Sequence, residues 1–157
     1  MDAKSRKGLV MISALDVAAF ILREKGPMTA MKLQKLVYYS QAWSLVWDEE
    51  PLFSEDVQAW ANGPVVPELF QAHKGRFKID AIPGGNPDKL DAKQAETVRG
   101  VLGYYGDKTS QWLSDLTHLE DPWKNARHGC PDGASCNTVI SLAAMAEYYG
   151  SLPPDAS

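Results

Sequence analysis

The segment TAMKLQKLVYYSQAWSLVW, residues 29–47, constrains the fold more than any other part of the chain. Leu33, Leu36 and Val37 recur at helical spacing, and aromatic or aliphatic residues make the remaining faces nearly as apolar. Four polar residues form the edge that we expect to face water: Lys32, Gln34, Lys35 and Gln41. A helix this apolar on most sides must be surrounded by other elements, so the segment predicts the central helix of the domain.

Caps, stop signals and helical spacing predict shorter helices around it. They cover residues 13–26, 67–75, 91–105, 110–118 and 140–151, with a helical turn at 123–127. Alternation over 56–60 indicates a short strand or extended arm, which a second short strand at 76–80 could pair with. The predicted fold class is mainly α (α+β): a compact single-domain bundle of five to six helices with a small two- or three-stranded β element.

The length of 157 residues suits one domain. We expect residues 1–12 to be a flexible N-terminal end, 13–152 to form the domain and 153–157 to be a C-terminal tail. No apolar run approaches the roughly 18 residues that a membrane span needs, so no membrane partner is expected. The two cysteines fall short of a disulfide framework, and together with the lack of a signal peptide they predict a cytoplasmic protein.

Charge is uneven along the chain. Residues 48–70 contain no Lys or Arg and six acidic residues: Asp48, Glu49, Glu50, Glu55, Asp56 and Glu68. Such a run is usually a solvated loop. An acidic rim around an apolar patch would also steer a basic partner, and both interpretations stay open here.

The run WANGPVVPELF, residues 60–70, has a specified local shape. Pro64 and Pro67 fix φ, and Gly63 permits dihedral angles closed to other residues. A rigid turn that launches the helix beginning at Pro67 is the economical structural interpretation. A preformed aromatic and proline surface around Trp60 would equally serve as an anchor for a protein partner, and the two roles are compatible.

No catalytic constellation stands out, and the chain is not expected to be an enzyme. The run HGCPDGASC offers His128, Cys130 and Cys136 as weak metal-ligand candidates, with His118 upstream as a fourth, but the spacing matches no tight zinc knuckle. A glycine-rich loop with two free thiols is the preferred interpretation, so no metal or other cofactor is predicted. His118 is the most plausible polar functional residue, as a general base or as a helix-end histidine.

A second hypothesis is a DNA-binding autorepressor. Two helices separated by a Gly-Pro break loosely resemble a helix-turn-helix, and this end of the chain is basic. The second helix is too apolar to lie free in a major groove, and Lys32 and Lys35 would be its only basic readers. Nucleic acid is therefore the less favoured partner.

Three separated motifs resemble a known family. They are KLQKLVYYSQAW (32–43), PLFSEDVQAWANGPVVPELF (51–70) and LSDLTHLEDPWKNAR (113–127), in this order. In this combination they resemble the SocA-type antitoxins, whose domain is also called Panacea and was described earlier through phage-associated GepA proteins. The resemblance covers roughly residues 14–150, and the HGCPDGASC loop departs from it.

The resemblance implies a non-catalytic antitoxin without a cofactor, of the kind encoded beside a toxin gene in prophages and other mobile elements. Its partner would be the cognate toxin protein, neutralised by occlusion or by presentation for degradation, in which case a protease or chaperone would also bind. The residues expected to contact a partner are Gln41, Trp60, Gly63, Pro64, Val66, Pro67, Glu68, His118 and Trp123.

Overall fold

The computed structural model describes residues 12–153. The prediction of a flexible N-terminal end over residues 1–12 lies outside the described residues except for Ile12, which is buried. The helices are α2 (Ala14–Lys25), α3 (Ala30–Trp47), α4 (Pro67–His73), α5 (Ala92–Tyr105), α6 (Ser110–Leu119), α7 (Asp121–Ala126) and α8 (Leu142–Gly150). The strands are β1 (Met28–Thr29), β2 (Val57–Trp60), β3 (Gly63–Val65), β4 (Lys78–Ile79) and β5 (Val139–Ile140), and a 3-10 turn covers Pro87–Lys89.

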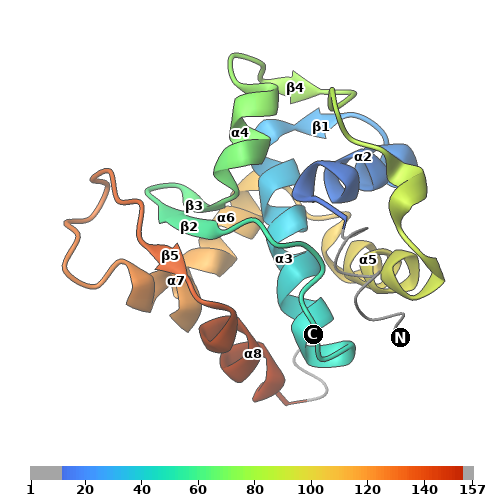
Figure 1. Ribbon diagram of the computed structural model, residues 1–157. Coiled ribbons are helices and arrows are strands. Elements are labelled where there is room, and N and C mark those ends of the chain that lie inside the picture. The colour runs from blue at the N-terminus through green and yellow to red at the C-terminus, as the bar shows by residue number, and fades with distance from the viewer. Residues whose placement is uncertain (1–11, 154–157) are drawn as a thin grey trace.

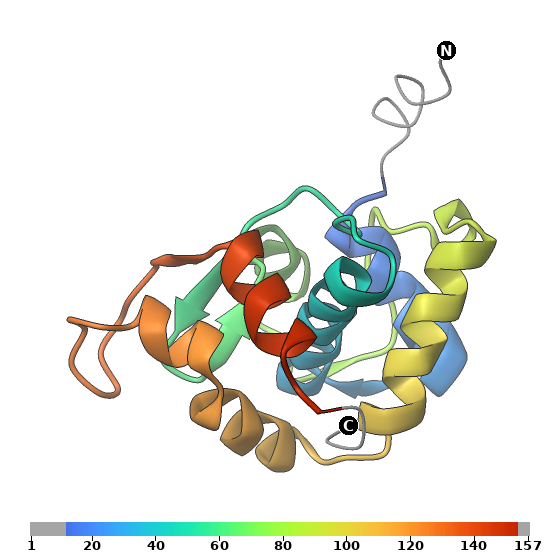
Figure 2. The ribbon, with the colours of Figure 1, turned by 90° about the horizontal axis from the view of Figure 1, so that it is seen from below.

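Helix α3 is the centre of the fold, as its sequence predicts. Helices α2, α5, α6 and α8 pack around it, and Figures 1 and 2 show it enclosed from two perpendicular directions. Leu33, Leu36 and Val37 have no exposed surface. The mainly α (α+β) fold class is confirmed. Residues 12–153 form seven α-helices, one more than the expected maximum of six, because the turn after Glu120 forms the six-residue helix α7.

Side-chain caps set where the helices begin. Ser13 and Asp16 form a reciprocal capping box at the start of α2, and Asp91 and Gln94 form another at the start of α5. Helix α2 ends at Gly26, whose φ of 88° favours glycine. The helix boundaries therefore follow from local sequence signals.

The strand pairing differs from the expectation. The strand at 78–79 does not pair with β2 but with β1, in the register Met28↔Ile79. Strand β2 lies instead between β3 and β5, with both neighbours antiparallel (Figure 1). The reason is chain geometry: Gly63 turns the chain straight back after β2, so β3 occupies the position that a later strand would need.

The prediction of a polar, solvent-facing edge on α3 is also wrong. Gln34, Lys35 and Gln41 are 3%, 1% and 0% exposed, so Lys32 is the one member of the predicted edge that meets solvent. The two glutamines are tolerated in the core because their amides are satisfied by backbone groups of the segment from Leu52 to Val66.

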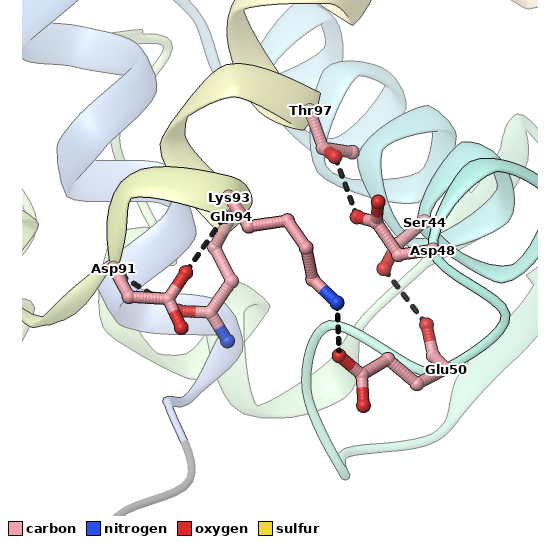
Figure 3. Close-up of polar contacts among 7 residues, drawn as sticks. All are labelled: Ser44, Asp48, Glu50, Asp91, Lys93, Gln94 and Thr97. Atoms are coloured by element: carbon pink, nitrogen blue, oxygen red, sulfur yellow. Dashed lines mark hydrogen bonds and ion pairs between the residues drawn. The ribbon is translucent and has the colours of Figure 1, made fainter.

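Part of the acidic segment is fastened to the fold. Asp48 accepts a hydrogen bond of 2.6 Å from Thr97, and Glu50 pairs with Lys93 at 3.1 Å (Figure 3). Ser44 donates to the backbone oxygen of Glu50 at 2.8 Å, which holds the turn against the end of α3. These two carboxylates therefore act within the molecule rather than as a free acidic rim.

None of the helices within residues 12–153 is both long enough and apolar enough to cross a bilayer.

A cleft between α3, the hairpin and α4 as the candidate functional site

A cleft of about 740 Å³ opens beside the N-terminal half of α3. Its walls come from α3, the β2–β3 hairpin, α4 with the residues after it, and the loop before β5. The residues that matter most to its chemistry are Met31, Gln34, Lys35, Gln58, Trp60, Asn62, Phe70, His73 and Arg76. Two basic residues and no aspartate or glutamate line it, so the cleft complements an anionic or neutral ligand.

Gln34 fixes the wall where β3 leads into α4. Its Oε1 accepts from the backbone N–H of Val66 at 2.9 Å, and its Nε2 lies 3.0 Å from Nε2 of His73. Val66 is the N-cap of α4 but offers no side-chain cap, so the glutamine of α3 binds the backbone there. Burial lowers the pKa of His73, which favours the neutral imidazole as the partner of the amide.

The aromatic part of the wall is preorganised by the hairpin. The Trp60 indole donates to Gln58 Oε1 at 2.9 Å, and its ring meets Phe70 edge-on with centroids 5.1 Å apart. The backbone oxygen of Trp60 accepts from the indole of Trp123 at 2.8 Å. Rigid aromatic groups of this kind provide contact area at little entropic cost, which suits a binding site.

Lys35 is the unusual residue of the cleft. It is 1% exposed, and no carboxylate between residues 12 and 153 lies within ion-pairing distance of its Nζ. Burial lowers the pKa of Lys35 to about 8. A lysine in such surroundings carries an uncompensated positive charge at neutral pH.

Gly63 makes room for this lysine. Its φ is 127°, and a β-carbon built on it would lie 2.4 Å from Lys35 Cε and 3.0 Å from Nζ. Thr117 Oγ1 of α6 is 3.3 Å from the same point. The glycine of the WANGPVVPELF run is therefore needed both for the turn and for the approach of the hairpin to α3.

His118 and Trp123 lie behind the hairpin and not on the cleft wall. Their rings stack with centroids 4.1 Å apart, and His118 Nε2 is buried without a hydrogen-bond partner in the described part of the chain. Burial, followed by the charge of Lys35, lowers the pKa of His118. The pair supports the hairpin from the side of α6 and α7.

Arg127 ties the loop before β5 to the hairpin. Its guanidinium donates to the backbone oxygens of Ala59 at 2.9 Å, Pro131 at 3.1 Å and Ala134 at 2.7 Å. The two cysteines of this loop, Cys130 and Cys136, are joined by a disulfide in the structure. The expectation of two free thiols is therefore wrong, and neither sulfur is a thiolate that could act as a metal ligand together with His128.

Besides His118 and Trp123, seven residues were predicted to bind a partner, and the structure separates them into three groups. Trp60 lines the cleft, and the exposed Glu68 and half-buried Pro67 begin α4 beside it. Gly63, Pro64 and Val66 are buried within the hairpin and its exit. Gln41 has no exposed surface, and its amide is bonded to the backbone of Leu52 and Phe53, so it shapes the fold from inside.

A comparison with family models finds a match to the antitoxin SocA-like, Panacea domain, over residues 33–124. The chain belongs to this family. The matched segment spans more than half of the chain and includes α3 from Leu33 onward, the hairpin and α4, so most of the cleft belongs to the family domain. Membership indicates an antitoxin role in the general sense. No curated protein and no solved structure matches the chain.

The titratable side chains of the cleft belong to Lys35, His73 and Arg76, and the sequence did not single out any of them as a contact of a protein partner. Lysine on a helix usually keeps its charge in water, and nothing in the spacing of Lys35 distinguishes it from Lys32. The available signal was the glycine at position 63, because a glycine between strands often marks the close approach of another group.

Proposed function

We propose that this protein is a non-catalytic antitoxin that neutralises its toxin by binding it directly, and that the cleft beside α3 is the binding surface. The observation that carries the proposal is the combination of an aromatic cleft with an exposed apolar rim. Met31 is 40% exposed at one lip, and Phe77 is 81% exposed just after the lining residues Gly75 and Arg76. Exposed apolar groups around a concave site are typical of protein-binding surfaces.

The two rim residues lie on neighbouring backbone segments. The backbone N–H of Ala30, the residue before Met31, donates to the backbone oxygen of Phe77 at 2.9 Å. Neither side chain is part of the buried core, so replacing them should leave the fold intact. A partner that covers Met31 and Phe77 would bury apolar area that the free protein exposes to water.

The first experiment is co-expression of this protein with the product of the adjacent reading frame, followed by co-purification and titration of the purified toxin. Relief of toxicity, a stable complex and inhibition at a one-to-one ratio without any protease would support occlusion by direct binding. A toxin that stays fully active with excess folded antitoxin would overturn the proposal for that pair.

The binding surface is tested with the double variant M31S/F77S. We expect it to weaken toxin binding by about tenfold or more, because it removes two apolar contacts from the rim. The matched control is Leu119→Ser, which removes a side chain that is 71% exposed on α6, away from the cleft. Equal loss in both variants, or no loss in either, would place the toxin elsewhere on the surface.

A further inference from the structure

The cleft holds a buried cation whose charge has no partner in the described part of the chain. Lys35 extends from α3 toward the hairpin, where its end lies against Gly63 and Thr117 of α6 is close to the same point. The groups that face it from these elements are neutral or basic: the Thr117 hydroxyl, the backbone of Gly63 and the His118 ring. The pKa of His118 is lowered by burial and by the charge of Lys35. Residues 12–153 supply no carboxylate within 4 Å.

The wider cleft adds a second cation, which unlike Lys35 is exposed and has a carboxylate partner, together with further hydrogen-bond donors. Arg76 is the second basic residue of the lining, and its guanidinium bonds the backbone oxygen of Ala81 while lying 3.8 Å from Asp80. Gln58, Asn62 and Asn137 add amide side chains that can donate, beside Ser135 and the Gln34–His73 pair. With aromatic rings on the same wall, the site combines hydrogen-bond donors, a desolvated positive charge and apolar surface.

We propose that the cleft is a carboxylate-binding site in which an aspartate or glutamate side chain of the toxin pairs with Lys35 Nζ. The proposal rests on the proposed function for the identity of the partner. Charge complementarity carries it: a buried lysine without a counter-ion is costly alone, and an incoming carboxylate would remove that cost while gaining a charge-assisted hydrogen bond. The toxin residues beside the acid would be apolar and would pack against Trp60 and Phe70, whose rings are in edge-on contact with each other.

This arrangement reverses the charge expected from the sequence. An acidic rim would have recruited a basic partner, but two acids of that segment are paired within the fold and none lines the cleft. The anchor that the cleft recognises is acidic. Lys35 would also discriminate between partners, because a neutral or basic side chain at this depth would leave its charge buried and unpaired.

The carboxylate site can be tested without the toxin. The probe is 3-phenylpropanoate, and 3-phenylpropanamide is its neutral analogue of nearly equal shape. With lysine labelled at ¹³Cε, the Lys35 signal is identified by its absence in Lys35→Met. We expect the acid to shift this signal, to raise the pKa of Lys35 and to bind at least about tenfold more tightly than the amide. Equal binding of acid and amide, or binding that persists in Lys35→Met, would overturn the site.

The toxin arm uses Lys35→Met with Lys32→Met as the matched control, since Lys32 lies on the same helix but outside the cleft lining. We expect Lys35→Met to weaken the complex by about tenfold or more and Lys32→Met to leave it within about twofold. A probe that needs Lys35 while the toxin binds Lys35→Met normally would show a small-anion site and overturn the assignment to a toxin carboxylate.

The two proposals fail in different ways. If the wild-type protein binds no toxin at all, the proposed function fails, and so does the assignment of a toxin carboxylate to Lys35. The probe titration still decides whether the cleft binds carboxylates. If the toxin binds and neither Lys35→Met nor the probe has any effect, the antitoxin function stands and the carboxylate site is excluded. Thermal unfolding of both lysine variants verifies that each is folded before binding is measured.

Discussion

Gly63 and Lys35 are in such close contact that a β-carbon on the glycine would lie 2.4 Å from Lys35 Cε. Two segments far apart in the sequence, the central helix and the hairpin, thus meet at a point where only a residue without a side chain fits. The contact explains why the turn after Trp60 requires glycine, and it fixes the lysine at the wall of the cleft.

We predict that Gly63→Ala destabilises the protein by about 2 kcal/mol or more, because the φ of 127° is strained for alanine and the methyl group meets the lysine. Urea denaturation measures the change. In the double variant G63A/K35A the steric part should disappear while the backbone strain remains, so the effects of the two single substitutions should not add. Strict additivity would show that the contact with Lys35 plays no part.

Lys35 should make stability depend on pH between about 8 and 10.5. The folded-state pKa of about 8 lies below the ordinary value of 10.5, so in this window the unfolded chain binds more protons and stability rises with pH. Below pH 8 the folded protein carries the buried charge. His118, which faces Lys35, has a lowered pKa and stays neutral throughout the window.

Lys35→Met removes this titration. At pH 7 we expect the variant to be more stable than wild type, by up to about 3 kcal/mol, since each pKa unit corresponds to about 1.4 kcal/mol. The gain should shrink steadily as the pH approaches 10. Parallel urea titrations of the two proteins at several pH values measure the difference, and a gain that does not change with pH would refute the assigned cause.

Gln41 provides the test of a structural role against a binding role. Its amide makes three hydrogen bonds, to Leu52 N at 2.7 Å, Phe53 N at 3.2 Å and Phe53 O at 2.9 Å. We predict that Gln41→Leu costs about 3 kcal/mol, because it leaves buried backbone groups without partners.

The control for that variant is Gln111→Leu, at an exposed position of α6, which should change the stability by no more than about 0.5 kcal/mol. Chemical denaturation of both variants gives the comparison. A loss below 1 kcal/mol for Gln41→Leu, with weaker toxin binding, would return this residue to the set of partner contacts.

The central helix could be predicted because its signal is local. Apolar residues on most faces of 29–47 leave no arrangement except burial, and Ser13, Thr29 and Asp91 mark helix starts by their own side chains. The burial of Gln34, Lys35 and Gln41 could not be predicted in this way. A polar side chain that meets water and one that meets a distant backbone have the same spacing, and the partners of these residues lie in other segments.

The strand pairing was unpredictable for a related reason. Strand β4 lies within the strand predicted at 76–80, but β1 and β5 are two residues long, too short for any alternation to be recognised. The registers of these strands depend on how the helices bring them together. The WANGPVVPELF run did predict a rigid turn into a helix. What it could not reveal was the lysine beneath it.

Arg127 should hold the loop before β5 against the hairpin. Its guanidinium bonds three backbone oxygens on the two segments and lies over the Trp123 ring, at 5.3 Å from the centroid. The neighbouring backbone bond from Ala59 N to Thr138 O, 2.9 Å long, depends on the same contact between the segments. In Arg127→Met we therefore expect the Ala59 amide to exchange with solvent about tenfold faster or more.

The control is Lys124→Met, at an exposed position of α7, the short helix that ends just before Arg127, and it should leave the exchange at Ala59 unchanged. Hydrogen exchange followed by NMR resolves this amide. Faster exchange confined to Arg127→Met would show that the arginine, and not the Cys130–Cys136 disulfide alone, positions the outer wall of the cleft. Because Ser135, Cys136 and Asn137 form that wall, the same variant should also weaken probe binding at Lys35. Unaltered exchange at Ala59 would mean that strand pairing suffices to hold the loop.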